Sequence, residues 1–459
     1  MSEFDPSRRK LLLTGGASVA LGLAGTRAQA QAEAKPWGAG KTSIWSTDPE
    51  EIREDRTRKQ RMAWWHQAAF GMFIHFGPYS VLGHGEWAIN REGIPIADYE
   101  RYGREFHPAE GCFTEWAKLA KAAGQRYMVM TAKHHDGFCN WNSKLTDWCA
   151  TKQGPKRDLV GEYVEAARKE GVGVGLYYSL MDWHHPDGAT CYENEDARRR
   201  FVDYTHGLVR EILSNYGKID ILWWDVPWPL DATGWESERL NKMVFDLQPH
   251  IIVNDRDRLP GDFSTPERNI VPAAGGRAWE TCMTLNNNWG YTKGDNGWKN
   301  AQTVIYQLIT CVRDGGNYLL NIGPRGNGSV PEPSRDILRQ VGAWIERNRE
   351  SIFDTDHCQI KQTNISIYTR KGNTLYMHIF AWTGDYAAIA GLQTKVLSAR
   401  FLVTGKPIRF KQSKLAVRFL DLPMEAPDSP MTTIAVECAS EPTQNTPWAR
   451  VLNEPRSTV

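Results

Sequence analysis

The sequence predicts an α/β fold, a TIM-like (β/α)8 barrel followed by a C-terminal antiparallel β-sandwich. Strand-like runs alternate with amphipathic helices between residues 70 and 322, which is the order that parallel βαβ units produce. After residue 351 the pattern changes to short alternating segments separated by Gly and Pro, which favours a small antiparallel domain. A doubly wound sheet is the alternative for the first part, but no glycine-rich phosphate loop follows the first strand-like run.

The N-terminal 30 residues have the order of an export signal. Arg8 and Arg9 precede a stretch of small and apolar residues that runs to Gly25, and Ala28-Gln29-Ala30 provides an A-x-A cleavage site. The paired arginines resemble a twin-arginine signal, so we expect a periplasmic or secreted protein. The expected organisation is a signal peptide at 1–30, a catalytic barrel domain at 31–352 and a β-sandwich domain at 353–459.

Each element of the barrel is predicted from its periodicity. Strand-like runs are rich in apolar, β-branched and aromatic residues, whereas the helices repeat apolar residues at i, i+3, i+4 and i+7. We expect strands at 70–76, 127–131, 172–178, 219–224, 251–254 and 318–322, and helices at 116–123, 159–169, 201–212, 238–247 and 301–312. A helix at 334–351 precedes sandwich strands at 375–380, 399–403, 416–420 and 432–436.

The composition excludes several classes of protein. The chain has 459 residues, 41% of them hydrophobic, and a formal net charge of +1. It therefore has enough apolar side chains for a packed core and no electrostatic reason to bind nucleic acid. No apolar run reaches the roughly 20 residues of a membrane-spanning helix. The 19 Trp residues suit either a Trp-rich core or stacking on sugar rings, and the sequence carries no signal for an oligomeric state.

The sequence gives little support for a metal or another cofactor. The eight cysteines form no C-x-x-C, and no His/Cys cluster has zinc spacing. We interpret most of them as buried apolar residues, with room for one or two disulfides in an exported protein. The side chains of consecutive His134 and His135 would leave a strand on opposite faces. We therefore expect no catalytic metal, with a metal-dependent hydrolase using these two histidines and His75 as the alternative.

Polar and aromatic side chains close five of the predicted strands. Because active sites of such barrels gather at the C-terminal ends of the strands, we expect these residues to converge on one rim. Asp225 is the sharpest candidate, since it follows an apolar strand and precedes Pro227. A carboxylate held there suits a nucleophile or base, and the alternative is a residue that caps the strand. The strand ends are 74–77 (IHFG), 133–137 (KHHDG), 177–179 (YYS), 223–225 (WWD) and 254–256 (NDR).

Four segments add a more specific signal. They are 70–77 (FGMFIHFG), 133–138 (KHHDGF), 154–158 (GPKRD) and 316–324 (GNYLLNIGP). In this order they resemble the α-L-fucosidase family, glycoside hydrolase family 29. The resemblance implies a retaining exo-glycosidase on a (β/α)8 barrel with a C-terminal β-sandwich, which releases terminal α-L-fucose by double displacement.

The resemblance also assigns roles to individual residues. The family's nucleophile closes the fourth strand and corresponds to Asp225. The residue at position 289 falls where an aromatic side chain packs against the C5 methyl of fucose. Each sugar hydroxyl both donates and accepts hydrogen bonds, so mixed imidazole and carboxylate partners can satisfy it. The substrate-binding positions correspond to His75, Glu86, Trp87, His134, His135, Tyr177, Trp223, Arg256 and Trp289.

Two glutamates compete for the role of general acid/base. Residues 263–267 (FSTPE) resemble the family segment that carries it, and Glu267 is expected in a loop that reaches over the glycosidic oxygen. Glu280 is expected to follow a short apolar stretch that forms strand six. We favour Glu267, and the alternative role for Glu280 is a structural or substrate-orienting carboxylate. The catalytic carboxyl groups of a retaining enzyme lie about 5 Å apart in the bound state.

The expected partner is a fucosylated oligosaccharide or glycoconjugate. Residues 279–282 (WETC) with 289–291 (WGY) resemble the subgroup restricted to α-1,3/4-linked fucose, which predicts that selectivity. The alternatives are another retaining glycosidase, such as an α-L-galactosidase, and a non-catalytic fucose-binding barrel. L-galactose is fucose with a hydroxyl added at C6, so an aromatic side chain facing a methyl group favours fucose.

Overall fold

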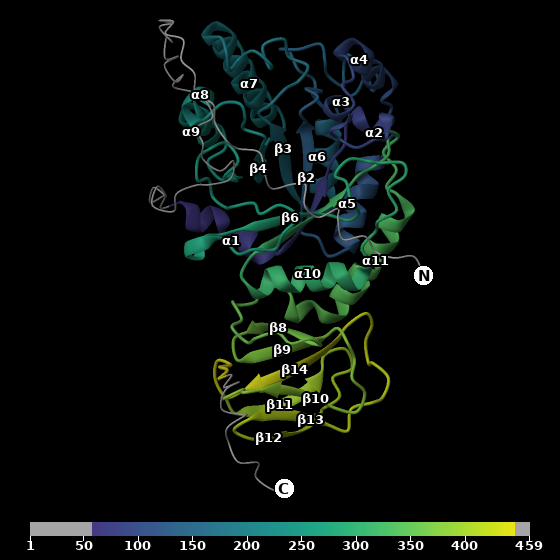
Figure 1. Ribbon diagram of the computed structural model, residues 1–459, viewed down its shortest axis with the longest axis vertical. Coiled ribbons are helices and arrows are strands. Elements are labelled where there is room, and N and C mark those ends of the chain that lie inside the picture. The colour runs from purple at the N-terminus through teal and green to yellow at the C-terminus, as the bar shows by residue number, and fades with distance from the viewer. Residues whose placement is uncertain (1–56, 446–459) are drawn as a thin grey trace, which may run out of the picture. The chain divides into compact units, whose positions relative to one another are not determined.

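The computed structural model describes residues 57–445 (Figure 1). They belong to one compact unit and form a parallel sheet with helices, followed by two antiparallel sheets. Within this range no helix combines the length and the apolar character needed to cross a bilayer. The expected signal peptide at 1–30 lies outside the described residues. It stays a prediction, as do the export route and the domain boundaries, and N-terminal sequencing of the exported protein would check the signal.

Seven regular parallel strands form most of the barrel. They are hydrogen-bonded in the order β5-β4-β3-β2-β1-β7-β6. The predicted strands agree with six of them within a few residues, and β6 is the seventh. The bounds are β1 (Phe70–Ile74), β2 (Tyr127–Lys133), β3 (Gly173–Ser179), β4 (Ile221–Asp225), β5 (Ile252–Val253), β6 (Glu280–Thr284) and β7 (Asn317–Ile322).

Residues 263–267 occupy the eighth place, between β5 and β6. Parallel bridges join Phe263 to the residue after β5, and Glu267 to Cys282 of β6. The segment is irregular in part because Pro266 has no N–H to donate to a ladder. It completes the ring, so the (β/α)8 prediction is confirmed. Glu267 lies at the end of this irregular segment, outside the regular strands, so the expectation that it lies in a loop stands.

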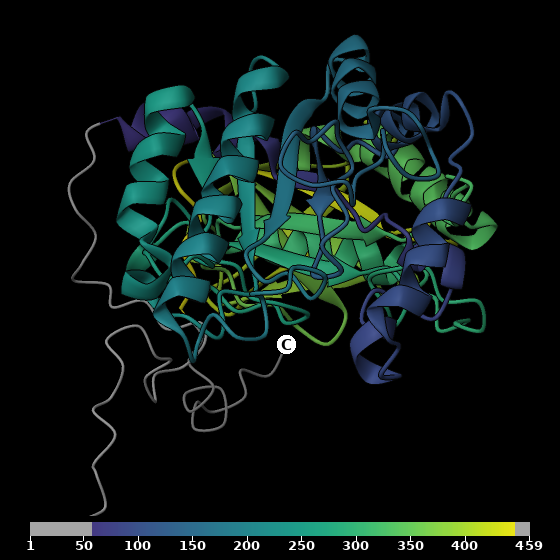
Figure 2. The ribbon, with the colours of Figure 1, turned by 90° about the horizontal axis from the view of Figure 1, so that it is seen from above.

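Helices connect the strands and lie on several sides of them (Figure 2). Three of the longer helices begin at Asp158, Asn194 and Asn300, whose side chains accept backbone N–H groups of the first turn. The bounds are α1 (Arg58–Ala68), α2 (Tyr79–Leu82), α3 (Ala88–Arg91), α4 (Ile96–Glu105), α5 (Cys112–Ala122), α6 (Leu159–Glu170), α7 (Glu195–Asn215), α8 (Ala232–Trp235), α9 (Ser237–Leu247), α10 (Ala301–Arg313) and α11 (Glu332–Asn348).

Alternation along the strands separates two apolar cores. On β4, Ile221 and Trp223 belong to the cluster inside the barrel. Leu222 and Trp224 belong to the cluster between strands and helices, because successive side chains of a strand point to opposite sides. Asp225 continues the inward row, so the strand's own period delivers its carboxylate to the mouth of the barrel.

The C-terminal part is an antiparallel β-sandwich, as predicted. One sheet has the order β10-β13-β12 and the other β11-β14-β9-β8, and apolar residues of both share one core. Helix α11 meets this part through Trp344, whose Nε1–H donates to the carbonyl oxygen of Met431 at 2.8 Å. The bounds are β8 (Ser366–Lys371), β9 (Thr374–Ile379), β10 (Ala387–Ala390), β11 (Val396–Phe401), β12 (Arg409–Gln412), β13 (Ala416–Leu420) and β14 (Thr432–Cys438).

The cysteines are part of the packed interior. All eight lie within the described residues, and each is a buried free thiol. Burial raises the pKa of the Cys112 thiol to about 12, which makes it a poor nucleophile at neutral pH. Their interpretation as buried apolar residues is therefore confirmed.

Candidate active site

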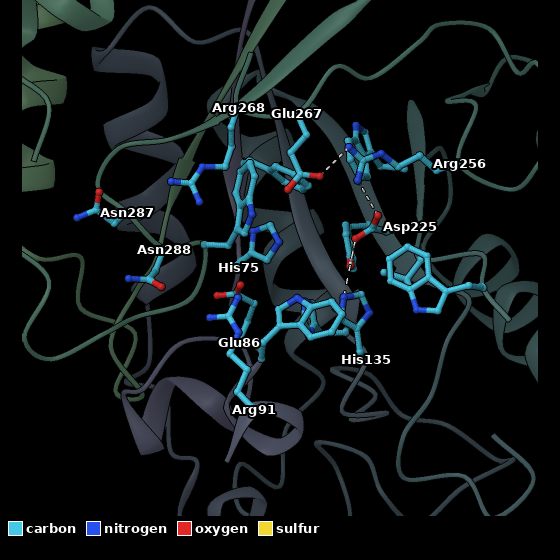
Figure 3. A pocket seen from close by; sticks show the side chains of 18 residues that line it. His75, Glu86, Arg91, His135, Asp225, Arg256, Glu267, Arg268, Asn287 and Asn288 are labelled. Atoms are coloured by element: carbon cyan, nitrogen blue, oxygen red, sulfur yellow. Dashed lines mark hydrogen bonds and ion pairs between the residues drawn. The ribbon is translucent and has the colours of Figure 1, made fainter. Parts of the chain in front are cut away.

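A pocket of about 310 Å³ opens at the C-terminal ends of the barrel strands (Figure 3). The sequence placed twelve residues in the candidate site, and the pocket brings eleven of them together. The exception is Glu280. The predicted residues that line the pocket are His75, Glu86, Trp87, His134, His135, Tyr177, Trp223, Asp225, Arg256, Glu267 and Trp289.

Asp225 is the last residue of β4, and hydrogen bonds hold its carboxylate at both oxygens. Tyr177 donates from its hydroxyl to Oδ2 at 2.6 Å, and Arg256 donates from a guanidinium nitrogen to Oδ1 at 2.7 Å. Burial raises the pKa of Tyr177 well above its usual range, and the neighbouring carboxylate adds to the shift. The phenol therefore stays a donor at physiological pH. The side chain of Asp225 is 13% exposed, so a reacting atom can reach it from the pocket.

Arg256 joins Asp225 to Glu267. Its side chain is 3% exposed and makes a second ion pair with Glu267 at 3.0 Å, while Nε–H donates to the hydroxyl of Thr265 at 2.8 Å. The guanidinium also lies 4.6 Å above the ring of Trp223. Burial alone would lower the pKa of Arg256, but the nearby carboxylates raise it. One fixed cation thus positions both carboxylates at the same end of the barrel.

Glu280 lies outside this pocket, and its predicted position was wrong. It begins β6 instead of following a strand, and its partner across the ladder is Asn317, the first residue of β7. The side chain is fully buried in the lower barrel, where it accepts hydrogen bonds from the hydroxyl of Tyr127 and from Nε1–H of Trp223. The sequence could not show this because a shift of a few residues along a strand moves a side chain from one end of the barrel to the other.

We expect Glu280→Gln to keep kcat within about tenfold of the parent, because the amide can still bind Trp223 and Tyr127. Burial raises the pKa of Glu280 from 4.5 to about 7. Between these values the unfolded chain loses its proton while the folded chain keeps it, so the parent loses about 3 kcal/mol of stability as the pH rises.

The Gln variant has no such loss. Urea unfolding at several pH values checks this. Between pH 4.5 and 7 the free energy of unfolding of the variant should rise relative to that of the parent. A stability difference that does not change with pH, or loss of nearly all turnover, would contradict a structural role for Glu280.

Two histidines present hydrogen-bond acceptors to the pocket. Nδ1 of His135 lies 2.6 Å from the hydroxyl of Ser179, which itself donates to the carbonyl oxygen of Met181. Nδ1 therefore donates, and Nε2, 4.0 Å from the carboxylate of Asp225, is left as an acceptor. Burial lowers the pKa of His135 well below its usual range, so the ring is neutral.

His75 has the same tautomer for the same reason. Its Nδ1 lies 2.7 Å from Oδ1 of Asn321, and the amide nitrogen of Asn321 donates to the carbonyl oxygen of Trp289 at 2.8 Å. The amide orientation makes Oδ1 the acceptor, so Nε2 of His75 is free to accept. Burial lowers the pKa of His75 to about 4. His134 lies between these rings and stacks on Tyr177 at 5.8 Å.

One side of the pocket is built on a close backbone contact. Glu86 accepts the backbone N–H of Gly290 at 2.7 Å. A Cβ atom at position 290 would lie 2.9 Å from the backbone nitrogen of Glu86, so this approach requires glycine. The adjacent Trp289 packs on His75 with ring centres 5.2 Å apart. Trp87 contacts His135 at 5.1 Å, and together they give the pocket aromatic walls beside its hydrogen-bonding groups.

Seven lining residues were not predicted. Phe73 precedes a predicted site residue by two positions on the same strand, so the strand period could have identified it. The others come from the end of the short helix α3, from strand ends and from loops, where no strand period applies. They are Arg91, Val226, Trp228, Arg268, Asn287 and Asn288.

Acidic, imidazole and thiol groups do not form a metal site in the described chain. Between residues 57 and 445, no three or more of them are arranged to hold an ion. What the pocket offers is a pair of carboxylates on one cation, two neutral imidazole acceptors and aromatic faces. This combination suits a polyhydroxylated ligand with an apolar side.

The chain is similar to known enzymes over most of its length. The family model described as Alpha-L-fucosidase matches residues 42–350. The tissue alpha-L-fucosidase of Homo sapiens is 32% identical over 377 residues, which are 74% of this chain and 80% of that protein.

Solved structures give the same result. The alpha-L-fucosidase isoenzyme 1 from Paenibacillus thiaminolyticus is 37% identical with a TM-score of 0.78, covering 84% of this chain and 100% of that one. An alpha-L-fucosidase from Bacteroides thetaiotaomicron, solved as a trapped covalent intermediate with 2-fluoro-fucosyl fluoride, is 26% identical with a TM-score of 0.78. The alignment covers 86% of this chain and 99% of that one.

Proposed function

Since the chain belongs to the α-L-fucosidase family, glycoside hydrolase family 29, we propose that it is a retaining exo-enzyme with Asp225 as nucleophile and Glu267 as general acid/base. Family membership makes it a glycoside hydrolase acting on α-L-fucosides. The finer proposal rests on one observation, the guanidinium of Arg256 that binds both carboxylates.

The proposed reaction has two displacements. In the first, a carboxylate oxygen of Asp225 bonds to the anomeric carbon while Glu267 gives its proton to the departing glycosidic oxygen. In the second, Glu267 takes a proton from water, whose oxygen attacks the same carbon and releases the carboxylate. Tyr177 and Arg256 hold the nucleophile in one orientation, which reduces the entropy lost on reaching the transition state.

The guanidinium that both carboxylates share supports retention over inversion. Retaining enzymes keep the two groups about 5 Å apart, whereas inverting enzymes leave roughly 6.5–9.5 Å for a water molecule between them. In this chain two nitrogens of one guanidinium bind them, at 2.7 Å for Asp225 and 3.0 Å for Glu267. A bridge by one side chain suits the shorter separation.

The sugar-binding part of the proposal rests on the hydrogen-bonding groups. Nε2 of His75 and Nε2 of His135 accept from sugar hydroxyls, and the buried carboxyl of Glu86 adds another polar partner. We propose that Trp289 packs against the C5 methyl of fucose. The hydroxymethyl group of L-galactose would lose a hydrogen bond to water against the same ring.

Proton NMR of hydrolysis by the purified protein tests the stereochemistry and the linkage together. With an aryl α-L-fucoside and an oligosaccharide carrying α-1,3/4-linked fucose, we expect α-fucose to appear first and then to mutarotate. Faster cleavage of the oligosaccharide than of the aryl fucoside supports the proposed α-1,3/4 selectivity, and cleavage of the aryl fucoside alone contradicts it. β-Fucose as the first product would rule out double displacement. If neither fucoside is cleaved, α-L-galactosides test the alternative sugar and a binding assay the non-catalytic barrel.

A further inference from the structure

Resting on the proposed fucosidase function, we propose that the mouth of the same pocket binds an anionic group, a carboxylate or a sulfate ester, on the sugar to which fucose is attached. Two arginines that the proposed reaction does not use, Arg91 and Arg268, line this cavity. Both are exposed, and the side chain of neither makes a hydrogen bond or an ion pair with a residue in the range 57–445.

The backbone of Arg268 turns its side chain into the pocket. Successive side chains of an extended strand point to opposite sides, so Glu267 and Arg268 would face different ways. Arg268 instead has φ of 54°, a left-handed conformation that residues other than glycine rarely adopt. Its N–H still donates to the carbonyl oxygen of Cys282 at 2.9 Å. As a result both side chains line the cavity.

The position of Arg268 identifies the part of the substrate that it meets. A general acid must reach the glycosidic oxygen, so the residue next to Glu267 faces the leaving group and not the fucose. Figure 3 shows Arg268 beside Glu267, and Arg91 beyond Glu86, both away from the pair formed by Arg256 and Asp225. Arg268, beside the general acid, therefore faces the space where the second sugar enters, and Arg91, exposed and lining the same cavity, adds a second positive charge at its mouth.

The carboxylates that line the pocket do not form ion pairs with Arg91 or Arg268. Both proposed catalytic carboxylates are bound by Arg256, and Glu86 accepts the backbone N–H of Gly290. Burial raises the pKa of Glu86, and Arg91 acts through space against that effect, but the two side chains form no ion pair. A carboxylate or sulfate of the substrate can therefore bind these guanidinium groups, whose planar N–H pairs match such anions.

Matched aryl α-L-fucosides test this charge preference. The carboxylate pair is the 4-(carboxymethyl)phenyl and 4-(carbamoylmethyl)phenyl fucosides, in which the methylene group keeps the acidity of the two phenols nearly equal. The sulfate pair is the 4-(2-sulfooxyethyl)phenyl and 4-(2-hydroxyethyl)phenyl fucosides. For each pair the measured quantity is the ratio of kcat/KM, anionic over neutral, because losses common to both substrates cancel.

We expect a ratio above 1 in at least one pair at low salt, falling as NaCl screens the charges. Arg91→Gln and Arg268→Gln should each lower that ratio about two- to fivefold, the range of an exposed charge pair, and Arg268→Lys should keep part of it. Lys411→Gln, on an exposed position of β12, is the matched control and should leave the ratio unchanged.

The pair with the larger ratio identifies the anion. A larger carboxylate ratio indicates an acidic sugar next to fucose, and a larger sulfate ratio indicates a sulfated one. Ratios at or below 1 in both pairs, or a ratio that neither arginine variant changes, would overturn the inference while the fucosidase proposal stands. Absence of hydrolysis of all four substrates and of the α-1,3/4-fucosylated oligosaccharide would overturn both.

Discussion

Replacing Asp225 by alanine is expected to lower kcat by about 10⁴-fold or more, the size of effect seen when an enzyme loses its nucleophile or its base. The covalent step needs a nucleophilic oxygen at this position, and neither neighbour supplies one. Arg256 has no oxygen in its side chain, and Tyr177 stays protonated because burial raises its pKa. Hydrolysis of an aryl α-L-fucoside under saturating conditions measures the loss. Circular dichroism and binding of L-fucose should show that the fold and the sugar site remain.

Azide distinguishes a missing nucleophile from general damage. In the alanine variant azide can enter the space left by the carboxylate and attack the anomeric carbon from that face. The expected product is β-L-fucosyl azide, with the configuration inverted. Asp225→Asn, which keeps the volume of the side chain, should be as inactive and should not respond to azide. Substantial turnover by either variant in buffer alone would mean that Asp225 is not the nucleophile.

Replacing Glu267 by alanine is expected to lower kcat/KM by about 10²- to 10⁴-fold for a fucosylated oligosaccharide. The loss should be much smaller for an aryl fucoside with an acidic phenol, because that leaving group departs without a proton. Steady-state kinetics with both substrates measures the difference. A side chain that only orients Arg256 through their 3.0 Å ion pair would affect the two substrates alike.

Azide should also rescue this variant, but with the opposite stereochemistry. Asp225 is still present, so the covalent intermediate forms, and azide then attacks it from the face that Glu267 has left open. The product expected is α-L-fucosyl azide. Glu280→Gln is the matched control, since it alters a carboxyl group that the structure buries away from the pocket. If the Glu280 variant, and not the Glu267 variant, shows the dependence on leaving group, the assignment of the acid is reversed.

Residues on regular strands could be predicted from the sequence because the period of a strand carries three-dimensional information. The inward row of β4 passes through Ile221 and Trp223 to Asp225. Once the strand is recognised, the side of the barrel that the carboxylate faces follows from alternation. The same alternation predicts, from the inward side chain of Phe73, that His75 also faces the inside of the barrel. The parallel order of the strands then brings these ends to one rim.

The choice between the two glutamates needed the tertiary structure. Glu267 and Glu280 are both near β6 in sequence. Glu267 ends a short segment and Glu280 begins another, and neither segment shows a clear hydrophobic period. Glu267 bridges Cys282 in the middle of β6, whereas Glu280 starts that strand beside Asn317. The register between neighbouring strands decides which carboxyl reaches the pocket, and register depends on pairing with distant segments.

The sequence by itself determined the (β/α)8 and β-sandwich architecture and the residues that end the regular strands. Hydrophobic periodicity, and the alternation of strands and helices along the chain, depend on residues that are close together in sequence. Only the tertiary structure decided that Arg256 binds both carboxylates, that Glu280 is buried below the pocket, and that Arg268 turns into its mouth. These depend on contacts between segments far apart in sequence and on one left-handed backbone conformation, and neither leaves a periodic trace in the order of the residues.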